Sequence, residues 1–160
     1  MISNLIETIK NYLRNRKEQQ SFKKKIEENG INDWIDKLYK LGFKDISFPI
    51  LIVYDEWDGI HLMIVGDIRE FAITNSIHYW PLDYDTKLLD CKGNLWNWKY
   101  DNINKTNLPG TMIKSLEIEE VKELVNQGIS GHKSKNEIKS KVNDAINIDE
   151  LLSKLSIYDL

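Results

Sequence analysis

Apolar residues recur every three or four positions near both ends of the chain, which is the spacing of one face of a helix. At the N-terminal end this pattern covers residues 2–13 and returns over residues 34–41. Gly42 follows the second run and is well placed to end that helix in a left-handed conformation. We therefore predict a helical region over residues 1–43.

In the middle of the chain the pattern changes to short runs rich in β-branched residues. Residues 50–54 (ILIVY) and 60–65 (IHLMIV) are apolar at successive positions, which predicts two strands buried centrally in a sheet and joined as a hairpin. In residues 69–73 (REFAI), the alternation of Phe71 with Ile73 favours a third strand. A short helix is the alternative interpretation of that segment.

Residues 87–100 (KLLDCKGNLWNWKY) show the clearest hairpin signal in the chain. Gly93 beside Asn94 favours a two-residue loop, either Lys92-Gly93 or Gly93-Asn94. Because alternate residues of a strand share a face, either loop predicts one face that carries large aromatic rings. We expect these rings to pack in the core, and the alternative is an exposed interface with a partner. The residues expected on that face are Leu89, Cys91, Trp96, Trp98 and Tyr100.

Three helical patterns close the chain, after Ser115, after Ser134 and after Asp149, each of which is a suitable N-cap residue. The preceding residues 101–110 (DNINKTNLPG) are expected to form a polar loop.

The order of helices, strands and helices predicts an α+β fold with a mainly antiparallel sheet of about five strands. Helices from the N-terminal and C-terminal regions should pack on this sheet. A chain of 160 residues fits one domain, residues 1–160, which is helical over 1–43, sheet over 46–101 and helical over 115–160.

Composition and charge narrow the function classes. The chain is 41% apolar and 29% charged, has no apolar run long enough to span a membrane, and lacks the pattern of a secretory signal, so we expect a cytoplasmic protein. A single cysteine, Cys91, excludes an intrachain disulfide and a cysteine-cluster metal site. Residues 45–101 hold ten acidic and four basic side chains, although the net charge of the chain is only −3. An acidic sheet disfavours nucleic-acid binding there.

Signals for catalysis are sparse. Cys91 has no predicted helix N-terminus or basic cluster beside it to activate the thiol, and the motifs of serine nucleophiles, phosphate-binding loops and calcium loops do not occur. We therefore assign no catalytic residue, no metal site and no cofactor. The alternative is a hydrolase or metal-dependent enzyme that uses His61, His78 and nearby aspartates, namely Asp58, Asp83 and Asp85. A third hypothesis, RNA binding by the basic residues 14–25, competes with an ordinary solvated helix face.

Two short segments combine aromatic rings with carboxylates, a pattern that suits an interface with a basic protein partner. Asp55, Glu56, Trp57 and Asp58 form the first segment, at the expected hairpin tip, and Asp83, Tyr84 and Asp85 form the second. The competing interpretation is a polar tip whose tryptophan folds back onto the core. The protein is expected to be a monomer or a homodimer.

The stretch Leu88-Leu89-Asp90-Cys91-Lys92-Gly93-Asn94-Leu95-Trp96, followed by Leu108-Pro109-Gly110 and the helix after Ser115, resembles small cytoplasmic immunity proteins of bacterial polymorphic-toxin systems. Cys91 stands where serine is more usual in those proteins. The resemblance implies a non-enzymatic protein that binds and neutralises a cognate toxin. An acidic sheet would suit a basic toxin domain.

Overall fold

The computed structural model describes residues 20, 21, 24, 30–56, 59–74, 86–104, 106–158 and 160, with the backbone alone for residues 55, 56 and 74. The predicted helix over residues 2–13 lies outside this part of the chain, as does most of the basic stretch 14–25. In sequence order the elements are α2 (Ile31–Leu41), η1 (Phe43–Asp45), β1 (Ile50–Glu56), β2 (Gly59–Val65), α3 (Ile68–Thr74), β3 (Lys87–Asp90), β4 (Asn94–Asp101), β5 (Thr106–Ser115), α4 (Ile118–Gly128), α5 (Lys135–Asn143) and α6 (Ile148–Leu155).

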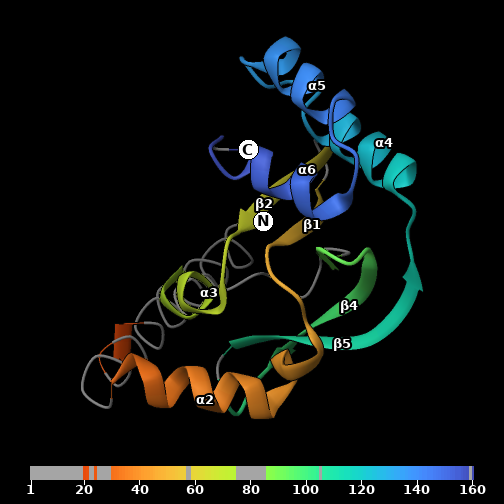
Figure 1. Ribbon diagram of the computed structural model, residues 1–160. Helices are drawn as coiled ribbons and strands as arrows, with labels where there is room; N and C mark the ends of the chain where they lie inside the picture. Colours follow the sequence, from red (N-terminus) through yellow and green to blue (C-terminus); the bar gives the residue numbers. More distant parts are fainter. Residues whose placement is uncertain are drawn as a thin grey trace, which may run out of the picture.

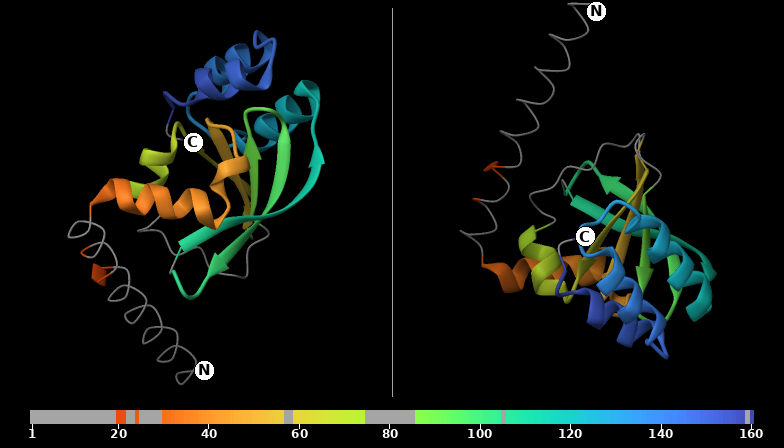
Figure 2. Two further views of the ribbon diagram at one scale, coloured as in Figure 1. Left: turned by 60° about the horizontal axis from the view of Figure 1, so that its bottom comes forward. Right: turned by 90° about the horizontal axis from the view of Figure 1, so that it is seen from above.

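The five strands form one antiparallel sheet in the order β2-β1-β3-β4-β5, and helices lie on both of its faces (Figure 1). Elements α2, η1 and α3 cover one face, and α4, α5 and α6 cover the other (Figure 2). The α+β class and the antiparallel sheet are thus confirmed. Within the described residues, no helix has the length and apolar character that crossing a membrane requires.

Strand β1 shows why residues 50–54 are apolar at every position. Ile50 and Ile52 point into the core under α2 and α3, whereas Leu51 and Val53 point into the core under α4 to α6. Each such buried side chain stabilises the fold by roughly 1.5–3 kcal/mol. The prediction of a central position is right for β1, which lies between β2 and β3, and wrong for β2, which is an edge strand whose faces are nevertheless covered.

The segment predicted as a third strand is helix α3 instead. Asp67 Oδ1 accepts a hydrogen bond from the Glu70 amide at 2.7 Å, and the Gly66 amide donates to the Glu70 carboxylate. These two bonds satisfy amides at the helix start in the manner of a capping box, and the spacing of Asp67 and Glu70 is the sequence signal for it. Phe71 is buried on the helix, with its ring 4.5 Å from that of Phe43.

The β3–β4 hairpin has a different register from the predicted one. Leu88 pairs with Trp96 and Leu89 with Leu95, so the loop between Asp90 and Asn94 contains three residues. Changing the loop length by one residue moves every side chain of one strand to the other face. Trp96 therefore shares a face with Leu88. The prediction that the aromatic rings share a face with Leu89 and Cys91 is wrong.

Trp96 and Trp98 do pack against the core under α2 and α3, as predicted for them. The Trp98 ring meets Phe43 and Phe71 edge-on, at centroid distances of 6.3 and 5.8 Å. Tyr100, further along the same face of β4, is half-buried.

The fifth strand is β5, in a region predicted as a polar loop. Asp101 organises the turn before it by accepting hydrogen bonds from the Ile103 amide at 2.8 Å and the Asn104 side chain at 2.7 Å. Strand β4 pairs with β5 through two register shifts; at the first, Leu95 pairs with Lys114 and Trp96 with Met112, which leaves Ile113 as an extra residue. Such bulges bend a strand, and β5 curves together with β4 before it joins α4 (Figure 1).

All three C-terminal helices exist, but two start at other caps than predicted. The N-cap of α4 is Glu117, which forms a capping box with Glu120, and the N-cap of α6 is Asn147, whose side chain accepts a hydrogen bond from the Glu150 amide. Ser134 is the N-cap of α5 as predicted, although its side chain makes no capping bond.

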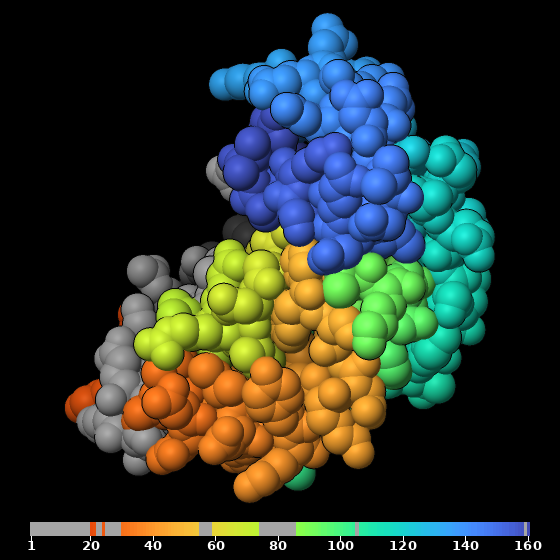
Figure 3. Space-filling model, viewed as in Figure 1, coloured from red at the N-terminus to blue at the C-terminus, as the bar shows by residue number. Residues whose placement is uncertain are grey.

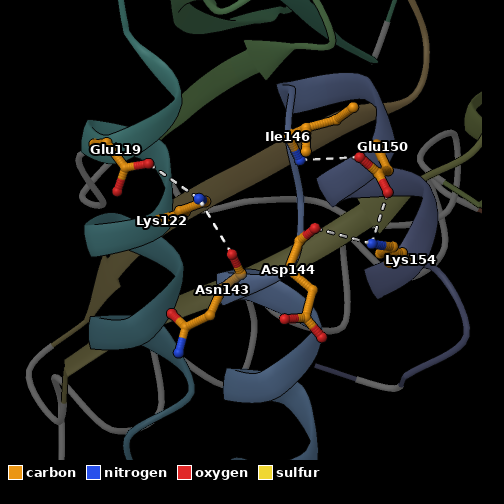
Figure 4. A network of polar contacts seen from close by, with 7 residues as sticks. All are labelled: Glu119, Lys122, Asn143, Asp144, Ile146, Glu150 and Lys154. Atoms are coloured by element: carbon orange, nitrogen blue, oxygen red, sulfur yellow. Dashed lines mark hydrogen bonds and ion pairs between the residues drawn. The ribbon is translucent and has the colours of Figure 1, made fainter.

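Two lysines tie α5 to the helices beside it (Figure 4). Lys122 of α4 donates to the backbone oxygen of Asn143 at 3.5 Å, and Lys154 of α6 donates to that of Asp144 at 3.5 Å. Each lysine also forms an ion pair on its own helix, with Glu119 at 3.0 Å and with Glu150 at 2.7 Å respectively. Cations at the carbonyl end of α5 are favourable because that end carries partial negative charge.

Candidate functional site

The acidic segment at residues 55–58 lies at the end of the β1–β2 hairpin. Asp55 pairs with Ile60 and Glu56 with Gly59, so the pairing continues up to the two residues Trp57 and Asp58. The described part ends there: the structure gives the backbone of Asp55 and Glu56, and Trp57 and Asp58 lie outside it. In the right-hand view of Figure 2, β1 and β2 run together toward the end of the sheet that lies away from α4 to α6.

The second predicted segment, Asp83, Tyr84 and Asp85, lies outside the described residues, as does His78. Its placement relative to the hairpin tip therefore stays a prediction.

His61 stands on β2 opposite Tyr54 of β1, and the two rings are stacked with centroids 5.3 Å apart and an angle of 14° between their planes. Among the residues that the structure describes, no three histidine, cysteine, aspartate or glutamate side chains group closely enough to hold a metal ion. Whether His61 and His78 converge stays untested.

Most of the described acids in the sheet region have structural roles. Asp67 and Glu70 cap α3, Asp101 organises the β4–β5 turn, and Asp90 lies buried at the β3–β4 turn. The hydrogen bond from Asn104 is the main reason why the pKa of Asp101 is lowered. These carboxylates contribute to the negative charge of residues 45–101, but their oxygens are engaged within the chain.

Asp90 is the strongest polar feature of the described residues. Its side chain is 0% exposed, and Oδ1 accepts hydrogen bonds from the amides of Lys92 at 3.0 Å and Asn94 at 2.9 Å. Its other oxygen, Oδ2, accepts from the side chains of Asn94 at 3.1 Å and Trp96 at 3.3 Å. Four donors around one carboxylate offset the cost of burying its charge.

Asp90 belongs to the stretch that resembles immunity proteins, and its role at the turn is not among the expectations drawn from the sequence. The signal that identifies it is an aspartate three residues before a glycine, at the end of an apolar run. An aspartate side chain there can accept from the amides of the turn while the glycine takes positive φ, which is +87° at Gly93. The motif is therefore a structural device of the hairpin.

Cys91 lies in the turn after β3 rather than inside a strand. Its thiol donates to the backbone oxygen of Phe48 at 3.1 Å, and the residue packs against the core under α4 to α6. Burial raises the pKa of the Cys91 thiol, and the negative charges of Asp149 and Asp90 raise it further. These surroundings favour the thiol over the nucleophilic thiolate.

Compared with models of protein families, with curated proteins and with solved structures, the chain matches none of them significantly.

Proposed function

We propose that this protein acts by binding and neutralising a basic, toxin-like protein partner, as bacterial immunity proteins do. The observation that supports the proposal is the β1–β2 hairpin, whose regular pairing extends to Glu56 and places two acidic positions at its end. The paired backbone of Asp55 and Glu56 holds these two acidic positions on the sheet, which suits recognition of a partner surface. Asp83, Tyr84 and Asp85 complete the proposed surface.

Charge supports the same assignment. Asp67, Glu70, Asp90 and Asp101 are engaged in caps and turns, so the acids at residues 55–58 and 83–85 make up most of the remaining negative charge of the sheet region. Carboxylates grouped around Trp57 and Tyr84 would attract a basic partner, while the rings supply apolar contact area.

The direct test is neutralisation of a neighbouring gene product. The C-terminal domain of an exported protein encoded immediately upstream is expressed in bacteria with and without this chain. We expect growth arrest by the domain alone, rescue on co-expression, and a purified complex of the two. A harmless domain, or arrest that this chain does not relieve, contradicts the proposal. A stoichiometric transition metal in the purified protein would instead favour the enzyme that uses His61 and His78.

The binding surface is tested by charge reversal. The variant Asp55→Lys/Glu56→Lys/Asp58→Lys should associate with that domain about tenfold or more slowly at low salt, with a smaller difference at high salt. The control Asp36→Lys/Asp45→Lys/Glu123→Lys makes the same change in charge at exposed positions on other elements. Equal association rates for the two variants, measured by stopped-flow fluorescence, would place the interface elsewhere.

A further inference from the structure

The residues in the second half of β5 are exposed, although the backbone of this segment pairs with β4 on one side. Thr111, Met112, Ile113, Lys114 and Ser115 are all exposed, and Met112 and Ile113 keep 42% and 44% of their surface accessible. This part of β5 contains the bulge at Ile113 and runs up to α4 along the outer margin of the molecule, and Figure 3 shows no described element outside that margin. Two adjacent exposed apolar side chains on an edge strand are a feature that proteins usually avoid.

The outer edge of this segment is open to another strand. Strand β5 is the last in the sheet and pairs with β4 alone, and residues 111–115 make no backbone hydrogen bond to any other described element. Edge strands are commonly protected by proline and by lysine. Pro109 protects only the first half of β5. In the second half, Lys114 forms an ion pair with Glu120 of α4 at 3.1 Å.

We propose that residues 111–115 pair antiparallel with the same residues of a second copy of this chain. The open segment has Ile113 at its centre, because it lies between Pro109-Gly110 and the end of β5 at Ser115. About a two-fold axis at Ile113, the sequence Thr-Met-Ile-Lys-Ser is complementary to itself.

The pairs across that axis match in chemistry. Thr111 meets Ser115 of the second copy, Met112 meets the aliphatic stem of Lys114, and Ile113 meets Ile113. No two like charges face each other, and β-branched residues pair favourably across strands. The paired segments would join two five-stranded sheets into one, and each exposed apolar side chain would gain a neighbour on the other copy. Because only five residues on each side take part, we expect a weak, concentration-dependent dimer.

Cysteine cross-linking tests the two-fold axis directly. In a Cys91→Ser background, Ile113→Cys places two thiols opposite each other, within reach of a disulfide. Under mild oxidation this variant should form covalent dimer at least about tenfold faster than Thr111→Cys, whose two copies lie far from each other across the axis. Ile103→Cys, at an isoleucine that is 90% exposed on the β4–β5 turn, measures random collisions. Equal rates for Ile113→Cys and Ile103→Cys overturn the proposal.

A second test leaves Cys91 in place. Sedimentation velocity of the unaltered chain from about 10 µM to about 1 mM should show a rising proportion of dimer. Ile113→Lys sets two positive charges against each other and should abolish this dimer, whereas Ile103→Lys should leave it unchanged. A chain that stays monomeric throughout, or a dimer that survives Ile113→Lys, refutes self-pairing; the monomer result would leave the edge for a strand of another protein.

Discussion

At Asp90 a single buried carboxylate determines the geometry of the β3–β4 turn. It accepts hydrogen bonds from the amides of Lys92 and Asn94 and from the indole N–H of Trp96. It therefore links the turn to the ring that packs on the core. The three-residue loop that results places Leu88 and Trp96 on one face. Asp90, which belongs to the stretch that resembles immunity proteins, thus determines the register in which β3 pairs with β4.

Replacing Asp90 should therefore destabilise the fold without touching the proposed partner surface. Asp90→Ala leaves several buried donors unpaired and should lower the free energy of unfolding by about 2–4 kcal/mol. Asp36→Ala, at an exposed position on α2, should change it by less than about 0.5 kcal/mol. Urea unfolding followed by tryptophan fluorescence measures both. Similar values for the two variants would show that the Asp90 hydrogen bonds contribute little.

At the scale of elements, close contact between α4 and β2 fixes the C-terminal helices on the sheet. A Cβ atom at Gly128 would lie 2.5 Å from Leu62 Cγ, so the last turn of α4 approaches the strand more closely than any other residue would permit. Sequence patterns identify α4 and β2 separately, and in them a glycine at position 128 is a typical end of a helix. The contact itself is visible only in the folded chain.

This contact predicts non-additive effects of substitution. Gly128→Ala should lower the free energy of unfolding by about 1–3 kcal/mol through overpacking, and Leu62→Ala by about 2–5 kcal/mol through a cavity. The double variant should lose at least about 0.5 kcal/mol less than the sum, because the new methyl group occupies the space vacated by Leu62. Gly131→Ala, whose Cβ would meet no atom within 4 Å, is the control. Strict additivity in urea unfolding would contradict the contact.

At the scale of the whole molecule, the carboxylates fall into two groups: those hydrogen-bonded within the chain and those proposed to bind a partner. Asp101 and the glutamates Glu120 and Glu150 have lowered pKa values, chiefly through hydrogen bonds from Asn104, from the Glu117 amide and from Lys154 respectively. The acids proposed to meet a partner are instead those of residues 55–58 and 83–85. Carboxylates that are hydrogen-bonded within the chain therefore affect stability, and those of the proposed partner surface should affect association.

The lowered pKa values predict the direction of acid sensitivity. A carboxyl whose pKa is lower in the folded chain than in the unfolded chain contributes stability above the unfolded value, near 3.8 for Asp101 and 4.5 for the glutamates, and that stability is lost as the pH falls through the folded value. The urea midpoint should thus fall as the pH is lowered from about 6 to about 3. Asp101→Asn/Glu120→Gln/Glu150→Gln should show a shallower fall. An unchanged slope in that variant would assign the acid sensitivity to other groups.

The sequence by itself determined the class of the fold, because periodicities of two and of about 3.6 residues report which faces are buried, and these patterns identify β1, β2, the tryptophan strand and the C-terminal helices. Hydrophobic periodicity did not decide three other features, which depend on polar capping bonds and on tertiary contacts. Residues 68–74 are helical because Asp67 and Glu70 cap them and Phe71 meets Phe43. The β3–β4 register follows from the hydrogen bonds of Asp90 to the turn. Residues 106–115 form strand β5 because they pair with β4. Each depends on contacts between residues that local hydrophobic patterns do not connect.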